Sequence, residues 1–526
     1  MLYYSIKSVF GARFLSQALP LVIAMSSWAD EPQTAPIDPP RLQSAIKHLD
    51  DLAGKTLEST GVPGIAIAVV HGNDILLKKG YGVREAGKPQ PIDAETVFQV
   101  ASVSKPITAT VLAALVGRGH IKWDDRVIDH DPGFRMYDPY VNRELRLRDL
   151  LCHRSGLPDH AGDLLEDIGY DQDEVLRRLR FQPPDSSFRS QYAYTNFGYS
   201  EAAYAAADAL GESWHELAAK ELFKPLGMTA TSYRFADYAK ATNRALLHVA
   251  DGGKSGKKWI AKFTRQPDAQ APAGGVSTTL GDLVRWTQLL VDDGKFDGRQ
   301  VVDPAALADT HTPQIVWNYS PEEGRVVSYG LGWNVCVERG GRVFWKHSGA
   351  FELGMRTEVA VLPAENLAIV VLSNAAPTGI PEGLVESFYD WALDGKLSRD
   401  WVEFANRMFD EEAKKELANQ GDYSRPLARP SPPLKLAAYT GKYENEYFGP
   451  IELSERAGKL VLRLGPAPLE FDLRHWDRDT FLYQPTGENA TGLSAVRFSV
   501  APTGQADRVL IENLNIHGLG TFTREK

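Results

Sequence analysis

The sequence predicts an α+β domain, in which an antiparallel sheet is flanked by helices and accompanied by an all-helical subdomain, followed by a small all-β barrel. Three observations predict this architecture. Apolar strands occur near the start and again late in the chain, helical periodicity dominates between them, and the tail changes to short alternating segments after a proline-rich stretch. With 526 residues the chain exceeds what a single core usually organises, so more than one domain is expected.

The first 29 residues have the pattern of a secretory signal peptide. Lys7 and Arg13 precede a mostly apolar stretch over 14–25, and Ser27 and Ala29 supply small residues before a cut after position 29. An uncleaved anchor is the alternative. We therefore expect a periplasmic or secreted protein. No later segment approaches about 18 unbroken apolar residues, so no membrane span is expected after the leader.

Residues 30–425 are predicted to form the α+β domain. A helix is expected over 42–57 and a hairpin over 64–77, and the apolar spacing of the next segment predicts a helix over 103–118. Helices and loops are expected to dominate 124–290. Strands are then expected over 329–337, 343–347, 357–362 and 367–372, with helices over 382–393 and 399–419. The sheet would therefore combine early and late segments.

The tail is predicted to be a separate barrel. Four prolines crowd into residues 426–435, which indicates a linker. Over 436–526, apolar residues alternate with polar ones in short runs separated by Gly, Pro and Asn, as at Leu460, Leu462 and Leu464. This pattern favours a small antiparallel barrel or sandwich, which we expect to shape the mouth of a cleft in the first domain.

Composition excludes some classes of function. The formal net charge of −10 argues against nucleic acid as a partner, because such binding needs a concentrated basic face. The cysteines are Cys152 and Cys336, without a Cys-x-x-Cys pair, so neither a thiolate zinc site nor a redox motif is expected. The sequence is compatible with a bridge between them or with two buried thiols.

The segment over 98–106 contains Ser102 and Lys105 in a Ser-x-x-Lys pattern. Residues three apart share one face of a helix, so the hydroxyl and the amine can meet there. A lysine whose proton is lost through burial can activate the serine as a nucleophile. The pattern is weak alone, because it also occurs at 44–47 and 255–258.

Two further short patterns carry possible chemistry. Tyr194 and Asn196 are two apart and can face one cleft, where a phenol relays protons and an amide orients a substrate. The segment from His347 through Ser348 to Gly349 ends an apolar strand, and glycine there lets the backbone approach a ligand. Each pattern has decoys, among them 140–142 and 443–445 for the first and 78–80, 160–162 and 254–256 for the second.

The order and spacing of the three patterns resemble those of the penicillin-recognising serine hydrolases, most closely the class C β-lactamase branch. Segments 150–158, 225–228 and 272–276 resemble further landmarks of that family. The likeness covers roughly residues 42–395. The tail, with 439–443 and 475–476, looks like the lipocalin-like barrel of some D-amino-acid-acting peptidases of this group.

The resemblance implies a role for each position. Ser102 would be the nucleophile that forms an acyl-enzyme, and Lys105 and Tyr194 would share the proton transfers. Asn196 would orient the substrate amide. The segment His347, Ser348 and Gly349 would contact substrate, and the backbone N–H groups of Ser102 and Ala350 would form the oxyanion hole. Neither a cofactor nor a metal is implied.

One departure bears on the substrate. Histidine stands at position 347, where many β-lactamases have a lysine facing the substrate carboxylate, and neutral imidazole is a weaker partner for an anion. This favours a D-amino-acid peptidase or an esterase over a β-lactamase, so D-peptides, esters and β-lactams all stay open as small-molecule or peptide substrates. An inactive relative that binds cell-wall material is a further alternative.

Other hydrolase classes have less support. A metal hydrolase would have to use His153, Asp159 and His160, which are loosely spaced for ligation, and no His-Glu-x-x-His occurs. Residues 253–255 imitate the end of a phosphate-binding loop, but His248 stands where that loop requires glycine. Without a Gly-x-Ser-x-Gly, the serine elbow of α/β-hydrolases is also unsupported. The oligomeric state stays open.

Overall fold

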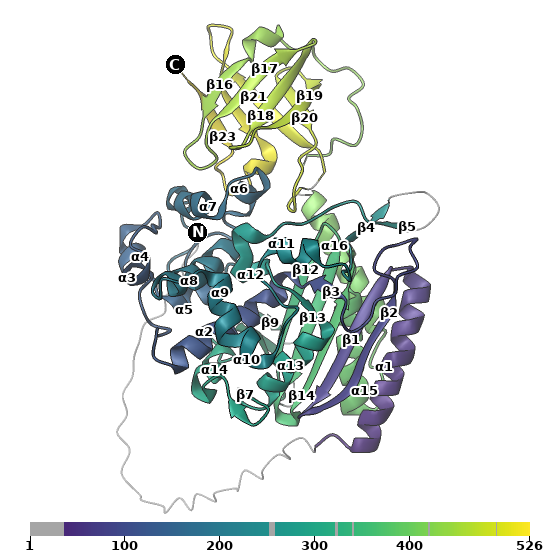
Figure 1. Ribbon diagram of the computed structural model, residues 1–526. Helices are drawn as coiled ribbons and strands as arrows, with labels where there is room; N and C mark the ends of the chain where they lie inside the picture. The colour runs from purple at the N-terminus through teal and green to yellow at the C-terminus, as the bar shows by residue number, and fades with distance from the viewer. Residues whose placement is uncertain are drawn as a thin grey trace, which may run out of the picture. The chain divides into compact units, whose positions relative to one another are not determined.

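Strands from residues 64–82 and from residues 315–373 pair into one antiparallel sheet (Figure 1). The computed structural model describes residues 36–251, 258–320, 324–338, 341–418, 421–490 and 492–525. The span Ile37–Lys526 forms one compact unit. The predicted signal peptide, residues 1–29, lies outside the described residues.

The sheet has eight strands in the order β2-β1-β14-β13-β12-β11-β10-β9, and every neighbouring pair is antiparallel. The early hairpin therefore completes a sheet whose other strands follow much later in the chain. The strand bounds are β1 Gly64–His71, β2 Asp74–Gly82, β9 Ile315–Ser320, β10 Arg325–Tyr329, β11 Asn334–Val337, β12 Val343–Phe351, β13 Met355–Leu362 and β14 Leu367–Ser373.

Both faces of the central strands are buried. In β1, Ile65, Ile67 and Val69 pack with the helices α1 (Pro39–Thr60) and α15 (Ile380–Asp394), whereas Ala66 and Ala68 join the core on the other face. Successive side chains of a strand point to opposite faces, so a strand covered on both sides reads as a continuous apolar run. This explains why residues 64–70 are apolar throughout.

The helical region lies in the chain between the two groups of strands, as predicted. Its longest members are α2 (Ser104–Gly117), α8 (Asn196–Asp208) and α13 (Leu280–Val291). Shorter α-helices are α3 Val127–His130, α4 Pro139–Glu144, α5 Leu147–Leu151, α6 Asp163–Asp167, α7 Gln172–Arg178, α9 Trp214–Ala218, α10 Lys224–Leu226, α11 Phe235–Lys240, α12 Ala271–Gly274 and α14 Pro304–Thr310.

Short strands interrupt the helical region: β3 Val97–Gln99, β4 His248–Asp251, β5 Lys258–Ile260, β6 Ser277–Thr279, β7 Lys295–Phe296 and β8 Arg299–Gln300, and β15 Ala375–Ala376 pairs with β4. The helix α16 (Trp401–Ala418) packs on α15.

Two predicted strand bounds are wrong. Residues 329–337 form not one strand but the last residue of β10 and the whole of β11, joined by a turn that the Gly330 N–H closes on the Trp333 carbonyl at 2.8 Å. Gly332 has φ +128° and lies against Tyr199, so glycine is needed in that turn. The strand predicted to end at His347 continues to Phe351, because residues up to Phe351 stay paired with β13.

The tail forms a closed barrel of eight strands, as the alternating pattern predicts. Its strands are β16 Gly441–Glu444, β17 Ile451–Arg456, β18 Lys459–Leu464, β19 Leu469–Asp477, β20 Thr480–Tyr483, β21 Ser494–Val500, β22 Ala506–Ile511 and β23 Thr521–Arg524. The predicted fold class is thus confirmed.

Two smaller expectations can also be compared with the structure. Cys152 and Cys336 are buried free thiols, so the second of the two alternatives for them is observed. Among the described residues, no helix combines the length and the apolar character needed to cross a membrane.

Candidate functional site

Ser102 lies in a tight turn between β3 and α2. A short 3-10 turn over Ala101–Val103 precedes α2, so the helix begins one residue later than predicted and Ser102 belongs to the turn. Ala101 has φ +46°, a backbone conformation that costs a non-glycine residue free energy and turns the chain sharply before the serine. Lys105 lies in the first turn of α2, three residues after Ser102, so the two side chains can lie on the same side.

Lys105 is fully buried, and its amine contacts polar atoms of the site. Its Nζ lies 3.3 Å from Ser102 Oγ, 2.8 Å from Asn196 Oδ1 and 3.1 Å from the Ala273 carbonyl oxygen. Burial lowers the pKa of Lys105 well below its usual value, and the charge of Asp163 opposes that shift only in part. The amine thus donates to three acceptors, one of which is the Ser102 hydroxyl oxygen.

Tyr194 approaches Ser102 from the helical region. Its hydroxyl donates to Ser102 Oγ at 2.8 Å, and the Lys105 amine lies 4.4 Å from the centre of its ring. Desolvation raises the pKa of Tyr194 above its usual value, so the phenol keeps its proton at neutral pH. The buried ring of His153 packs at 4.6 Å from the Tyr194 ring and holds it in place.

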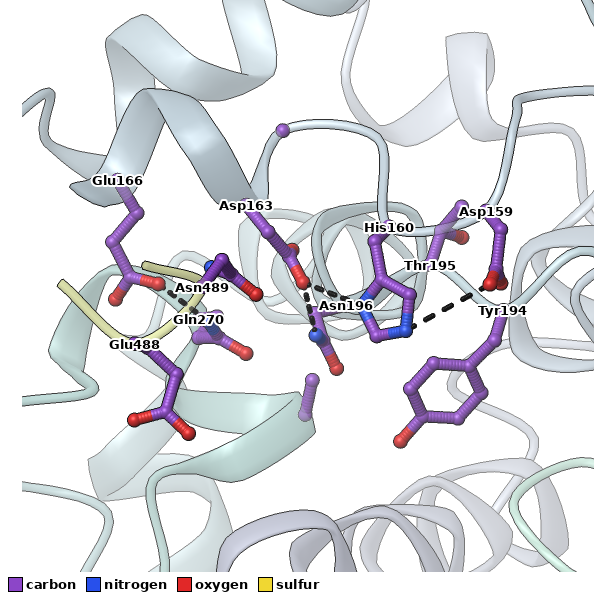
Figure 2. Close-up of polar contacts among 12 residues, drawn as sticks. Asp159, His160, Asp163, Glu166, Tyr194, Thr195, Asn196, Gln270, Glu488 and Asn489 are labelled. Carbon is purple, nitrogen blue, oxygen red and sulfur yellow. Dashed lines mark hydrogen bonds and ion pairs between the residues drawn. The ribbon is translucent and has the colours of Figure 1, made fainter. Parts of the chain in front are cut away.

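A chain of hydrogen bonds connects Lys105 to the surface through Asn196, the first residue of α8. Asn196 Nδ2 donates to Asp163 Oδ2 at 2.8 Å, and His160 Nδ1 approaches the same oxygen at 2.8 Å (Figure 2). Removal from water lowers the pKa of His160, but the hydrogen bond and charge of Asp163 outweigh this and raise it to about 9. His160 is therefore protonated at neutral pH and partners Asp163.

The third predicted segment divides into residues that face the cavity and residues that do not. Ser348 and Ala350 line a cavity of about 280 Å³ together with Ser102, Tyr194 and Asn196. His347 is 4% exposed and points inward, with Nε2 2.8 Å from the Tyr329 hydroxyl and Nδ1 2.7 Å from the Ser348 carbonyl oxygen. Burial, assisted by the charge of Lys105, lowers the pKa of His347 to about 3, so its ring is neutral.

Gly349 permits the contact between β12 and the serine turn. A Cβ at this position would lie 2.3 Å from the Val100 carbonyl oxygen and 3.1 Å from the Ser102 nitrogen. Only glycine leaves room for the strand to pass so close, which brings the backbone of Ala350 to the cavity that Ser102 also lines. Five of the eight predicted residues thus line one cavity, namely Ser102, Tyr194, Asn196, Ser348 and Ala350. Lys105 lies behind them in contact with Ser102 and Asn196, and His347 faces the interior.

The cavity contains residues that sequence reasoning missed. Asp163 and His160 come from α6 and the preceding loop, Arg265 from the segment before α12, and Glu488 and Asn489 from the barrel. The barrel residues lie in the loop after β20 and line the same cavity as Ser102. Figure 2 shows them on the side of Gln270 and Asp163. No local pattern in the sequence predicts that two residues so far along the chain would reach Ser102.

The decoy patterns lie elsewhere. Ser44 and Lys47 are exposed on α1, and Tyr140 is 55% exposed, whereas Ser255 is outside the described residues. Of the histidines considered as metal ligands, His153 accepts a hydrogen bond from the Thr195 N–H and His160 partners Asp163. In the described part of the chain, no three His, Cys, Asp or Glu side chains are grouped so that they could hold a metal ion.

A family model described as Beta-lactamase matches residues 45–383, which include every residue of the site except those from the barrel. The chain belongs to the β-lactamase family. This places it among the serine hydrolases, as the three patterns predict. A second model, of a domain of unknown function (DUF3471), matches residues 425–520 and so covers most of the barrel.

Similar proteins in this family have several names. An unguisins hydrolase of Aspergillus violaceofuscus is 27% identical over 74% of this chain and 73% of its own length. Penicillin-binding protein 4 of Amycolatopsis lactamdurans is 29% identical over 62% of this chain and 83% of its own. A D-alanyl-D-alanine-carboxypeptidase/endopeptidase of Escherichia coli K12, AmpH, is 24% identical over 68% and 90%.

One solved structure matches both the α+β part of the chain and the barrel. The octameric penicillin-binding protein homologue from Pyrococcus abyssi matches with a TM-score of 0.56 and 19% identity, covering 89% of this chain and 98% of its own. At this identity the likeness concerns the fold alone. It includes the barrel as well as the sheet.

Proposed function

We propose that this enzyme hydrolyses D-amino-acid peptides or esters through an acyl-enzyme on Ser102. The observation that carries the proposal is the buried Lys105 amine, 3.3 Å from the Ser102 hydroxyl, with a lowered pKa. A neutral amine in this place takes the proton as Ser102 Oγ attacks the carbonyl carbon. The N–H groups of Ser102 and Ala350 are the proposed donors to the oxyanion.

Tyr194 is the proposed carrier of the proton to the leaving group. Its hydroxyl already donates to Ser102 Oγ at 2.8 Å, and its raised pKa keeps it a donor. As the carbonyl–leaving-group bond breaks, the phenol protonates the leaving group and recovers a proton from Lys105. Water then attacks the acyl-enzyme, its proton returns to the Lys105–Tyr194 pair, and Ser102 leaves with a proton restored to Oγ.

The neutral His347 favours peptidase or esterase activity over β-lactamase activity. Its two ring nitrogens engage Tyr329 and the Ser348 carbonyl, and its pKa of about 3 leaves it no positive charge for a substrate carboxylate. We propose Asn196, Ser348 and Gly349 as the groups along which the substrate lies. Nitrocefin should therefore be a poor substrate compared with D-aminoacyl p-nitroanilides or short p-nitrophenyl esters.

Labelling with a fluorophosphonate tests the nucleophile. The wild type should take up label on Ser102, and Ser102→Ala should lose it. Ser44→Ala is the matched control, because Ser44 begins another Ser-x-x-Lys but is exposed on α1. Equal label on the wild type and on Ser102→Ala would make the assignment wrong, and a chain that takes no label and turns over no substrate would be a binding relative.

We also propose export and a division of the chain. The leader 1–29 would be removed, leaving a hydrolase domain over 30–425, a linker over 426–435 and a barrel over 436–526, in the periplasm or outside the cell. Substrates would then include peptides derived from the cell wall. Amino-terminal sequencing of the exported protein should begin at Asp30, and an intact leader on the mature protein would contradict cleavage.

A further inference from the structure

A buried acid that the proposed mechanism does not use lies next to the strand that carries Ser348. Glu358 on β13 is the cross-strand neighbour of Ser348 on β12, and the Ser348 hydroxyl lies 2.7 Å from Glu358 Oε2. Glu358 is 4% exposed, whereas Ser348 lines the cavity that also contains Ser102. A substrate in the cavity can therefore contact Ser348 directly and sense Glu358 through it.

The charged groups packed around Glu358 leave it without a cation of its own. Lys346 on β12 pairs with Glu386 of α15, and Arg356 on β13 pairs through Nε with Glu382 of α15 at 2.7 Å. Three acids therefore share two cations in this layer between the sheet and α15. Among the described residues Glu358 forms no ion pair, and its hydrogen-bond donor is the serine hydroxyl.

These surroundings hold the carboxyl of Glu358 close to the point where it gains or loses its proton. Burial and the charge of Glu382 raise the pKa of Glu358 to about 8, and the positive charge of Lys346 opposes this shift only in part. Tyr389 of α15 keeps its proton because burial raises its pKa, and β14 carries no Asp, Glu, His, Lys or Arg. Glu358 therefore changes its charge just above neutral pH, where an ordinary carboxyl stays ionised.

The charge of Glu358 determines the direction of its hydrogen bond with Ser348. An ionised carboxylate can only accept, so the Ser348 hydroxyl donates to it and presents its lone pairs to the cavity. A protonated carboxyl donates to Ser348 Oγ instead, which leaves the serine proton free for a group in the cavity. The distance of 2.7 Å between the two oxygens suits either direction.

We propose that Glu358 is a positioning residue that makes Ser348 a donor to the substrate when Glu358 is protonated and an acceptor when it is ionised. The inference rests on the proposed function, because it concerns substrate recognition at the Ser102 site. The proton that Glu358 gains or loses is exchanged with solvent, and no bond of the substrate changes. A substrate carboxylate beside Ser348 is bound by the first form and disfavoured by the second, in which Glu358 adds a negative charge.

The test compares two esters that differ in one group. D-alanyl esters of glycolate and of glycolamide share the acyl group, and their leaving alcohols end in a carboxylate or a carboxamide. Titration of the reacting residues affects both esters alike and cancels in the ratio of their kcat/KM values. For the wild type, the ratio of carboxylate to carboxamide should fall about 10-fold as pH rises from about 6.5 to about 9.5, because Ser348 changes from donor to acceptor.

Two variants separate the acid from the hydroxyl through which it acts. Glu358→Gln keeps a polar side chain beside Ser348 but cannot titrate, so its ratio should stay constant over this pH range. Ser348→Ala removes the hydroxyl and keeps the acid, and most of the pH dependence should be lost there too. Glu352→Gln is the matched control, because Glu352 lines the cavity but is exposed, and it should keep the wild-type fall. Fluorophosphonate labelling of Ser102 reports that each variant is folded.

Several results would overturn the inference and leave the acyl-enzyme intact. They are a wild-type ratio that does not change with pH, a labelled Glu358→Gln variant that keeps the wild-type fall, a Ser348→Ala variant that keeps it in full, or a Glu352→Gln variant that loses it. If Glu358→Gln takes no label, Ser348→Ala decides. Failure of the proposed function looks different, since the wild type would take no label on Ser102 or would hydrolyse neither ester.

Discussion

The reactive wall of the cavity and the acidic wall differ in how their polar groups are partnered. On the reactive wall, Lys105 and Tyr194 each form a hydrogen bond with Ser102 Oγ. On the acidic wall, Asp163 and Glu488 each keep a buried oxygen without a donor. The groups proposed to perform chemistry thus have a geometry fixed before substrate arrives, whereas the acids on the other side keep acceptors that no side chain of the site satisfies.

The largest loss of activity is expected from replacing Lys105, the proposed base. Lys105→Ala should lower kcat/KM about 10²- to 10⁴-fold, because the proton of Ser102 loses its acceptor. Steady-state kinetics on a p-nitrophenyl ester measure this. Lys47→Ala removes the lysine of the exposed decoy pattern and should behave as the wild type. Similar losses in both variants would mean that the effect is not one of catalysis at Ser102.

Removing the phenol alone should have a smaller effect. Tyr194→Phe keeps the ring that packs on His153 but deletes the hydroxyl that donates to Ser102, so kcat should fall about 10²-fold with little change in folding. The loss should be greater for an anilide than for a p-nitrophenyl ester, whose leaving group needs no proton. Tyr140→Phe at the exposed decoy is the control, and a wild-type rate for Tyr194→Phe on both substrates would contradict the proton relay.

The carboxylate that links the two walls should alter the pH profile. Asp163 raises the pKa of Lys105, and activity requires the neutral amine, so the rate rises as pH passes upward through that pKa. Asp163→Asn removes the charge, which lowers the pKa of Lys105 further and moves the rising limb of kcat/KM to lower pH. The maximum rate should also fall, about 10-fold, since the Asn196 amide loses the acceptor that orients it.

Asp159→Asn is the control for this experiment, because Asp159 lies beside His160 but is 62% exposed. Its pH profile should match that of the wild type. A limb that moves to higher pH in Asp163→Asn would contradict the role given to neutral Lys105.

The smallest expected effect comes from loosening the acidic wall. Asp167→Ala deletes the acceptor of three hydrogen bonds from the barrel loop and should raise KM for a D-aminoacyl p-nitroanilide by a few-fold to about 10-fold, because Glu488 and Asn489 are no longer held at the cavity. Fluorophosphonate should still label Ser102, because Asp167 does not contact the reactive wall. Asp173→Ala, which replaces an exposed acid in the first turn of α7, should leave KM unchanged.

The sequence predicts most of the reactive wall and little of the acidic one. Ser102 and Lys105 are three residues apart, the spacing that places two side chains on one face of a helix. Tyr194 and Asn196 are two residues apart, the spacing that places two side chains on one face of an extended segment. The inward turn of His347 was missed, since its partner Tyr329 lies on β10, a strand whose end was itself predicted wrongly. Asp163 and Glu488 belong to no recognisable pattern, and their contacts to the site are long-range.

By itself, the sequence determined the fold class and the barrel and predicted a set of reactive residues, because apolar periodicity and short-range spacing act within a few turns of the chain. Only the tertiary structure decided which of several similar sequence patterns come together, that His347 is neutral and faces inward, and that a barrel loop brings Glu488 to the cavity that Ser102 lines. Those outcomes depend on burial and on contacts between distant segments, which set hydrogen-bond partners and pKa values. Such contacts produce no periodic pattern in the sequence from which they could be predicted.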